Sequence, residues 1–220
     1  MTISDEVRSR GIVEVLHFTT NRGIVGTLAT GALLSRHRLP LADYLQHTLH
    51  VNAADRPEAR AFFDKSHNWL DYVNLSISEI NRRYFLVSQR WHIDADIWWG
   101  ILAFDPIIMS HDDVVFATTN NSYDLCVRKS GLLGFNDLFE PSIPRKAPSW
   151  KAHRLQRLSF LPTCEQAEVL YLGQISTEYL RRIYVQDENC HDIAKGWLRE
   201  FGLRGVDVLI SPQKFEGQPN

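Results

Sequence analysis

Short apolar runs and longer segments of helical period follow one another along the chain, and this pattern predicts a mixed α+β fold. Strands are expected where β-branched and aromatic residues gather or partly alternate with polar ones. The segments that fit are 12–18, 71–77, 97–104, 114–118, 167–172 and 206–210. No internal repeat or low-complexity tract accompanies them, which favours an ordinary globular domain.

Three segments carry helix signals instead. Asn21 precedes a segment of helical period and is expected to cap a helix there. Asp55 and Glu58 form the Asp-x-x-Glu pattern of a capping box, which predicts a second helix ending near Phe63. Asn189 precedes a third helix, whose apolar face ends before a glycine at position 202.

The stretch 141–151 contains three prolines among basic residues and resembles a linker between domains. The strand-like segments on either side are too few to build two separate cores. We therefore expect a long surface loop inside one domain that spans residues 1–220. About ten residues at the N-terminus and about eight at the C-terminus are expected to be loose.

Composition narrows the class of protein. Apolar residues make up 44% and charged residues 23%, which excludes a disordered chain, a collagen-like repeat and a coiled coil. The longest uncharged apolar stretch, 97–104, is too short to span a bilayer. The polar N-terminus shows no secretory signal, and three widely spaced cysteines predict no disulfide framework. We expect a cytoplasmic protein without a membrane partner.

The net charge of −2 argues against a protein that coats nucleic acid without specificity. A local basic cleft is compatible with this net charge. His47 and His50 have a spacing that can hold a metal, but no carboxylates complete the site. Further metal-like groups, at 92–96 and 111–113, fall in predicted turns, where Asp is common for its own reasons. We expect no metal site.

Two local patterns point more sharply to chemistry. His17 ends a predicted strand just before a predicted helix, a place where ligands commonly bind. Gln166 and Glu168 are two residues apart at the entry to an apolar strand, so period-two geometry predicts that they share one face. Each pattern also has a structural reading, in which His17 is a packed residue and the pair is an exposed strand start.

Several short motifs, taken in order over residues 15–210, resemble the DarT family of DNA ADP-ribosyltransferases. The motifs are Val15 to Asn21, Thr30 to Leu34, Asp71 to Val73, Phe116 to Asn120 and Gln166 to Leu170, followed by Ile175, Tyr179, Leu180 and Ile183 to Val185. The resemblance implies one ADP-ribosyltransferase-like domain, with a mixed sheet core and flanking helices. It also implies a glycosyltransferase that takes NAD+ as co-substrate and modifies single-stranded DNA.

The resemblance assigns roles to individual residues. Glu168 matches the family's catalytic glutamate, which would face the positive charge that develops on the ribose. Gln166 would orient the incoming base, and Arg56 lies about where the family places an arginine near NAD+, with Arg60 as the alternative. The residues expected to bind NAD+ are His17, Thr19, Asn21 and Tyr72.

Two basic and aromatic segments are candidates for binding the DNA strand, because single-stranded DNA needs phosphate contacts and stacking surfaces. The candidate residues are Arg82, Arg83, Arg145, Lys146 and Arg154, with Trp150 among them. Each of them also reads as an ordinary solvated residue. The segment 78–83 departs from the turn expected in thymine-modifying relatives, so we expect guanine in preference to thymine as the target base.

The resemblance further implies a toxin of a toxin–antitoxin or phage-defence system, with a cognate antitoxin that removes the modification. Two alternatives stay open. One is an ADP-ribosyltransferase that acts on RNA or protein, since the same NAD+ site would serve. The other is a module that binds nucleic acid or NAD+ without catalysis.

Overall fold

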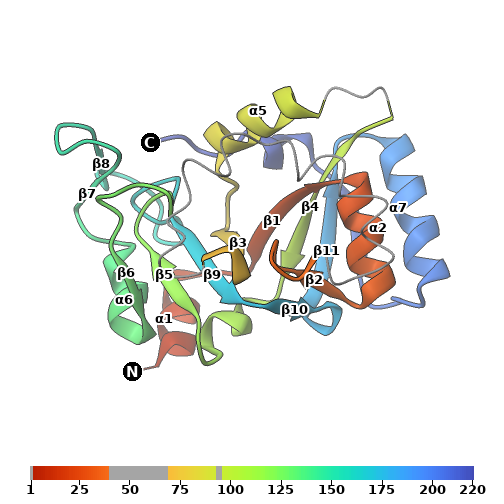
Figure 1. The fold of residues 1–220 in the computed structure, drawn as a ribbon, viewed down its shortest axis with the longest axis horizontal. Helices are drawn as coiled ribbons and strands as arrows, with labels where there is room; N and C mark the ends of the chain where they lie inside the picture. Colours follow the sequence, from red (N-terminus) through yellow and green to blue (C-terminus); the bar gives the residue numbers. More distant parts are fainter. Residues whose placement is uncertain (1, 40–68, 93–95) are drawn as a thin grey trace.

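The computed structural model describes residues 2–39, 69–92 and 96–220, and one large mixed sheet organises them (Figure 1). The strands pair in the order β12-β11-β4-β1-β3-β9-β5-β6. Neighbours are antiparallel except β11 and β12, which are parallel. The strands are β1 (Val15–Thr20), β3 (Tyr72–Ile77), β4 (Trp99–Phe104), β5 (Val115–Ala117), β6 (Arg128–Ser130), β9 (Glu168–Leu172), β11 (Leu180–Val185) and β12 (Asp207–Ile210).

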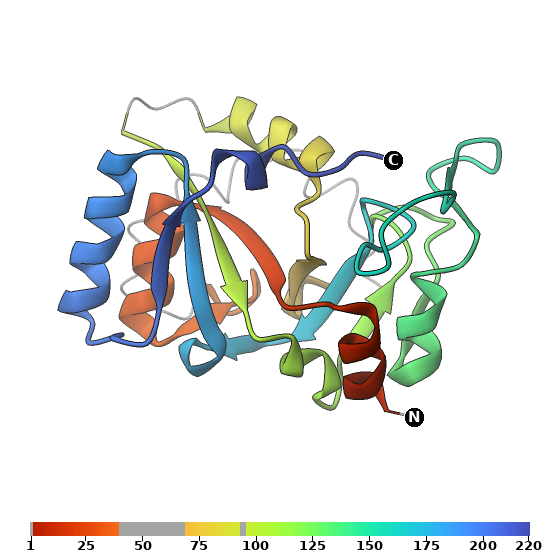
Figure 2. The same cartoon turned by 180° about the vertical axis from the view of Figure 1, so that it is seen from behind.

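Helices and two small sheets surround this sheet. α2 and α7 lie side by side at one flank, α5 runs along one edge, and α1 and α6 gather at the opposite end (Figures 1 and 2). The helices are α1 (Ile3–Arg10), α2 (Asn21–Thr30), α5 (Arg82–Trp91), α6 (Gly131–Asp137) and α7 (Glu188–Glu200). The small sheets pair β2 (Ala32–Leu34) with β10 (Gln174–Ser176), and β7 (Ser142–Pro144) with β8 (Lys151–His153). Short 3-10 turns are η3 (Trp69–Asp71), η4 (Pro106–Ser110), η5 (Thr177–Tyr179) and η6 (Pro212–Phe215).

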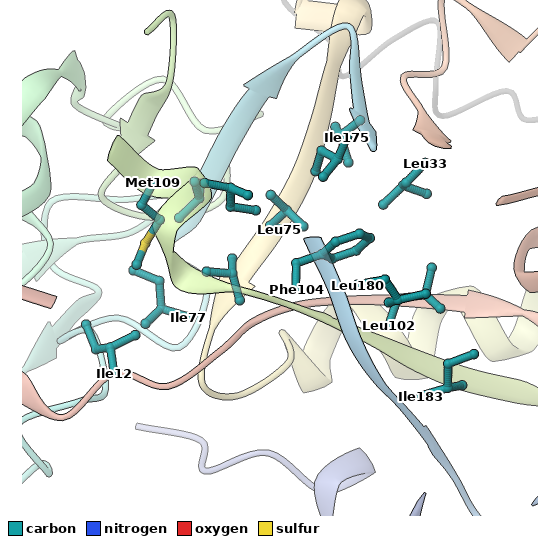
Figure 3. Close-up of a cluster of buried hydrophobic side chains, with 14 of the residues drawn as sticks. Ile12, Leu33, Leu75, Ile77, Leu102, Phe104, Met109, Ile175, Leu180 and Ile183 are labelled. Atoms are coloured by element: carbon teal, nitrogen blue, oxygen red, sulfur yellow. The ribbon is translucent and has the colours of Figure 1, made fainter. Parts of the chain in front are cut away.

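The main core lies against one face of the sheet, where alternate strand residues are apolar. Leu75 and Ile77 of β3 pack there with Leu102 and Phe104 of β4, as Figure 3 shows. Ile183 of β11 joins them and is fully buried. Burial of each such side chain stabilises the fold by roughly 1.5–3 kcal/mol. The core therefore fixes the strands whose other residues form the site.

The sheet is not continuous between its two halves. β1 pairs with β4 along its whole length, from Val15 to Thr20. With β3, however, β1 pairs only at Val15 with Ile77 and at Leu16 with Ser76. Beyond these two pairs the strands diverge, while β3 continues to pair with β9. This split at the centre of the sheet positions the site.

The α+β fold predicted from the sequence is confirmed, and each predicted strand segment overlaps a strand. The helix starts differ by one or two residues: Thr20, not Asn21, caps α2, and Asp187, not Asn189, caps α7. The capping box at 55–58 lies outside the described residues. The stretch 141–151 is not a simple loop, since it forms the β7–β8 hairpin.

The expectation of loose termini is wrong. Thr2 and Asp5 form a capping box at the start of α1, and Val7 of this helix is buried in the core. At the other end Phe215 is buried, and Asn220 donates hydrogen bonds to the carbonyls of His153 and Thr163. The C-terminal segment runs beside α5 in both views (Figures 1 and 2). Burial and hydrogen bonds order both ends, which the polar pattern did not show.

Candidate active site

A cavity of about 540 Å³ opens where β1 and β3 diverge. Its wall comes from β1, the first turns of α2, residues 72–76 of β3, part of α5 and the loop at 120–122. Four residues expected from the sequence to act in catalysis or NAD+ binding line it together: His17, Thr19, Tyr72 and Glu168. They come from three strands, so the fold gathers residues that are far apart in the sequence.

Glu168 is the first residue of β9 and is only 8% exposed. Its Oε2 accepts a hydrogen bond of 2.8 Å from Nδ2 of Asn74 and one of 3.3 Å from the backbone N–H of Asn121. Among the described residues, neither a hydrogen bond to Oε1 nor an ion pair to this carboxylate is present. One oxygen is therefore fixed by the protein, and the other is left for a ligand in the cavity.

Burial raises the pKa of Glu168 to about 7. Three groups oppose this rise by favouring the charged form: the N–H of Asn121, the amide of Asn74 and the positive charge of Arg128. Near neutral pH the side chain is therefore divided between its ionised and protonated forms. A carboxyl group in this condition can both stabilise positive charge and accept a proton.

His17 fills the gap between the diverging strands. Its Nδ1 lies 2.9 Å from the backbone oxygen of Asn74, which is a carbonyl and can only accept, so Nδ1 carries the proton. Burial lowers the pKa of His17, which keeps the ring neutral. The neutral ring leaves Nε2 as a hydrogen-bond acceptor, suited to a hydroxyl group of a ligand.

The first turn of α2 forms the wall next to His17. Thr20 caps this helix by accepting from the N–H of Gly23, and both residues line the cavity. A Cβ atom at position 23 would lie 2.0 Å from Oγ1 of Thr19, so only glycine lets this turn approach β1 so closely. The positive end of the helix dipole makes such a turn a favourable place for an anion.

Contacts of Arg128, missed in the sequence, hold the loop that supplies Asn121. Arg128 Nε donates to Oδ1 of Asn121 at 2.6 Å, and the same guanidinium also bonds the carbonyls of Asn121 and Cys126. It also lies over the ring of Trp69, with 5.5 Å from Cζ to the ring centroid. Asn74 was also missed, although asparagine is unusual in the middle of a strand and could have drawn attention.

Two residues expected at the site are placed differently. Gln166 lies in a turn before β9, so the period-two argument that paired it with Glu168 does not apply. It is buried, its Nε2 donates to the hydroxyl of Tyr123 at 3.3 Å, and it is not part of the cavity wall described above. Asn21 also turns away, because its Nδ2 donates to the carbonyl of Asp96 at 2.9 Å.

The candidate DNA-binding residues divide into two groups. Arg145 is buried and paired with Glu165 at 2.6 Å, and Arg154 donates to backbone carbonyls such as that of Leu161 at 3.2 Å. Both guanidinium groups bond to other residues of the fold, whereas the sequence suggested that they contact DNA. Arg82 forms an ion pair with Glu216. Arg83 and Lys146 are exposed, and Arg83 also pairs with Glu165 at 2.9 Å.

Arg56 and its alternative Arg60 lie outside the described residues, as do His47 and His50. Among the metal-like groups that are described, Asp96 pairs with Arg22 at 3.1 Å, and His111 bonds the hydroxyl of Tyr171 at 2.8 Å. Over residues 2–39, 69–92 and 96–220, no group of three or more His, Cys, Asp or Glu side chains could hold a metal ion. In the same ranges, every helix is too short or too polar to cross a bilayer.

Residues 16–216 match the family model described as ssDNA thymidine ADP-ribosyltransferase, DarT. The DarT of Thermus sp. 2.9 in complex with carba-NAD+ has a similar fold, with a TM-score of 0.61 and 15% identity over 92% of this chain and 97% of that one. The same protein in complex with ADP-ribosylated ssDNA matches with a TM-score of 0.61 and 14% sequence identity, over 93% of this chain and 96% of that one. Thermosipho africanus DarTG in complex with ADP-ribose matches with a TM-score of 0.57 and 14% sequence identity, over 94% of this chain and 52% of that one. This chain therefore spans about half the length of DarTG. A search of curated proteins finds no match.

Proposed function

The chain belongs to the DarT family, and from this premise we propose that it transfers ADP-ribose from NAD+ to a base of single-stranded DNA. The observation that carries the proposal is Glu168, a buried carboxylate with one fixed oxygen and one oxygen left for a ligand. It lies in the same cavity as a neutral histidine and the first turn of a helix. Each of these groups suits a different part of NAD+.

The cavity offers NAD+ complementary contacts along its length. The positive end of the α2 dipole suits the diphosphate, and Nε2 of His17 suits a ribose hydroxyl. Tyr72 and Trp69 lie with their ring centroids 5.2 Å apart in the cavity wall and offer aromatic surface to a flat ring. The related Thermus DarT has been obtained with NAD+ and with carba-NAD+, which supports NAD+ as the co-substrate.

The reaction needs few protein groups. The bond between the ribose C1′ and the nicotinamide nitrogen breaks, nicotinamide leaves as a neutral ring, and positive charge develops near C1′. Ionised Glu168 stabilises this charge through its free oxygen. A nucleophilic atom of the base then bonds to C1′, and its proton passes to the carboxylate of Glu168.

In this proposal, the DNA strand binds at exposed residues near the β7–β8 hairpin. Trp150 is 37% exposed, and the guanidinium of Arg83 lies 5.7 Å from the centroid of its ring. An aromatic face beside exposed cations can stack a base and neutralise phosphates. Lys146 belongs to the same hairpin and is exposed. The related Thermus DarT in complex with ADP-ribosylated ssDNA supports a single-stranded partner.

For the base, guanine is our prediction, motivated by the segment 78–83 and by the amide of Gln166. The description of the matching family names thymidine, which is the competing assignment. The buried Oε1 of Gln166 has no hydrogen-bond partner among the described residues, so it could accept from an amino group such as that of guanine. The amide does not line the cavity, so a base would have to reach it beside Tyr123.

The deciding experiment offers labelled NAD+ to DNA, RNA and protein side by side, followed by mass spectrometry of oligonucleotides that each lack one base. Label on single-stranded DNA alone supports the proposal, and label on RNA or protein alone supports the alternative transferase. Modification of a guanine-free strand, but not of a thymine-free strand, would overturn the guanine assignment. Absence of nicotinamide release with every acceptor would favour the non-catalytic binding module.

A biological role follows from the family. We propose that the protein is a toxin whose DNA modification is removed by a cognate antitoxin. The match to part of a DarTG chain supports a partner of this kind. Co-expression with the neighbouring open reading frame, scored by growth and by loss of ADP-ribose from DNA, tests it.

A further inference from the structure

Asn74 occupies the middle of β3 and contacts both chemical groups of the cavity. Its side-chain Nδ2 donates to Oε2 of Glu168 at 2.8 Å. Its backbone carbonyl, which faces the gap left by the split, accepts from Nδ1 of His17 at 2.9 Å. One residue therefore links the carboxylate on β9 with the histidine on β1.

We propose that Asn74 is a positioning residue that selects which oxygen of Glu168 meets the substrate. Its amide donates to Oε2 only, and the N–H of Asn121 donates to the same oxygen from the opposite loop. These two donors fix the carboxylate plane and leave Oε1 toward the cavity. This inference rests on the proposed function, because it assigns Asn74 a part in the same reaction.

The alternative is that Asn74 only fills space between strands. Against this reading, its polar amide belongs to a strand whose core-facing residues, Val73 and Leu75, are buried apolar side chains. A hydrogen bond to a charged acceptor also favours the charged form. Asn74 therefore opposes the effect of burial on Glu168 and keeps the carboxylate usable near neutral pH.

The direct test uses the ligand-free protein and needs no activity. Carboxyl-carbon NMR titration of Glu168, assigned by its loss in Glu168→Gln, is compared between the unmodified protein and Asn74→Leu. Leucine is similar in size and has no donor, so the pKa of Glu168 is expected to rise by about one pH unit or more. The NMR signals of His17 should keep the same tautomer, because the backbone carbonyl is retained.

Asn189→Leu, on the exposed surface of α7, is the matched control and should leave the titration unchanged. If Asn74→Leu does not fold, Asn74→Ser is measured instead, because its short hydroxyl cannot span the same distance. An unchanged pKa of Glu168 in a folded Asn74 variant would overturn the proposal.

Kinetics supply the second readout. For nicotinamide release, Asn74→Leu should lower kcat about tenfold at pH 7 and leave KM for NAD+ within about twofold of the unmodified protein. The acid limb of its plot of kcat against pH should move to higher pH. An equal loss of kcat at every pH, with the acid limb at the same pH as in the unmodified protein, would show a purely structural role and reject the proposal. Full activity of Glu168→Gln would instead contradict the proposed function, and the titration of the ligand-free protein would still decide the role of Asn74.

Discussion

Two buried glutamates three residues apart, Glu165 and Glu168, have opposite surroundings. The carboxylate of Glu165 is 1% exposed and pairs with Arg145 at 2.6 Å and with Arg83 at 2.9 Å. The carboxylate of Glu168 meets two neutral donors, from Asn74 and Asn121, and forms no ion pair with the described residues. The first charge is neutralised by ion pairs, whereas the second is oriented by neutral donors and has no ion-pair partner among the described residues.

This difference is the one expected between a structural carboxylate and the catalytic carboxylate that we propose. A buried ion pair holds elements together, and the Glu165–Arg145 pair ties the turn before β9 to the β7–β8 hairpin. A buried carboxylate without an ion-pair partner costs stability, and such groups are typical of ligand-binding and catalytic sites.

The largest effect is expected for Glu168→Gln, which keeps the shape of the side chain and removes its charge. ADP-ribose transfer should fall by a factor on the order of 10³ or more, since the charge near C1′ loses its stabilising group. Transfer of label to oligonucleotides measures this, with circular dichroism as the control for folding. Retained transfer in a folded variant would remove Glu168 from the mechanism.

The same variant tests stability against pH. Between pH 4.5 and about 7 the folded state keeps the proton of Glu168 and the unfolded state has lost it, so stability decreases as pH rises through this window. Above about pH 7 Glu168 is ionised in the folded state, and burial of this charge lowers the free energy of unfolding by about 3 kcal/mol. Glu168→Gln should therefore gain stability at pH 8 and little at pH 4, measured as Tm at both values. A gain of equal size at both pH values would contradict this account.

Glu165→Gln should act in the opposite sense. Removal of one partner leaves Arg145 buried beside a neutral amide, and the free energy of unfolding should fall by about 3–5 kcal/mol. Urea unfolding of Glu165→Gln and Glu168→Gln, compared at pH 8, makes the contrast direct. If Glu165→Gln were as stable as the unmodified protein, the division between the two glutamates would not hold.

His17→Ala is expected to have a smaller effect, confined to NAD+. Loss of Nε2 as an acceptor should weaken binding about tenfold, or about 1.4 kcal/mol. Calorimetric titration with carba-NAD+ measures this without turnover, and DNA affinity serves as the internal control. Equal affinity for carba-NAD+ in both proteins would return His17 to a packing role.

The smallest effect is expected at the exposed cations. Arg83→Ala should raise KM for DNA a few-fold and reduce the slope of log affinity against log salt by about 0.7, the value for one phosphate contact on a single strand. Lys195→Ala, on the exposed surface of α7, removes the same charge at the far flank and is the control. An identical salt slope for both variants would move the DNA path away from Arg83.

Local patterns in the sequence predicted most of the sheet correctly. The strand segments around β1, β3, β4, β9 and β12 follow from their β-branched and apolar residues, because backbone preference and burial act in the same direction there. The prediction that residues 141–151 form a loop was wrong, because the pairing of β7 with β8 depends on a partner that composition does not specify. The helix starts were missed by one or two residues because several capping residues stand together at each of them.

Short patterns and motifs in the sequence were enough to predict the fold class, the family and four residues of the cavity wall, Glu168 and His17 among them. Which charged side chains are free to meet a ligand became clear only from their packing in the folded protein. Arg145 looked like a phosphate ligand until the fold placed it against Glu165, and Asn74 had no assigned role until it lay between β1 and β9. The physical reason is that burial and hydrogen-bond partners depend on residues distant in the sequence, whereas a strand or a cap depends on its neighbours.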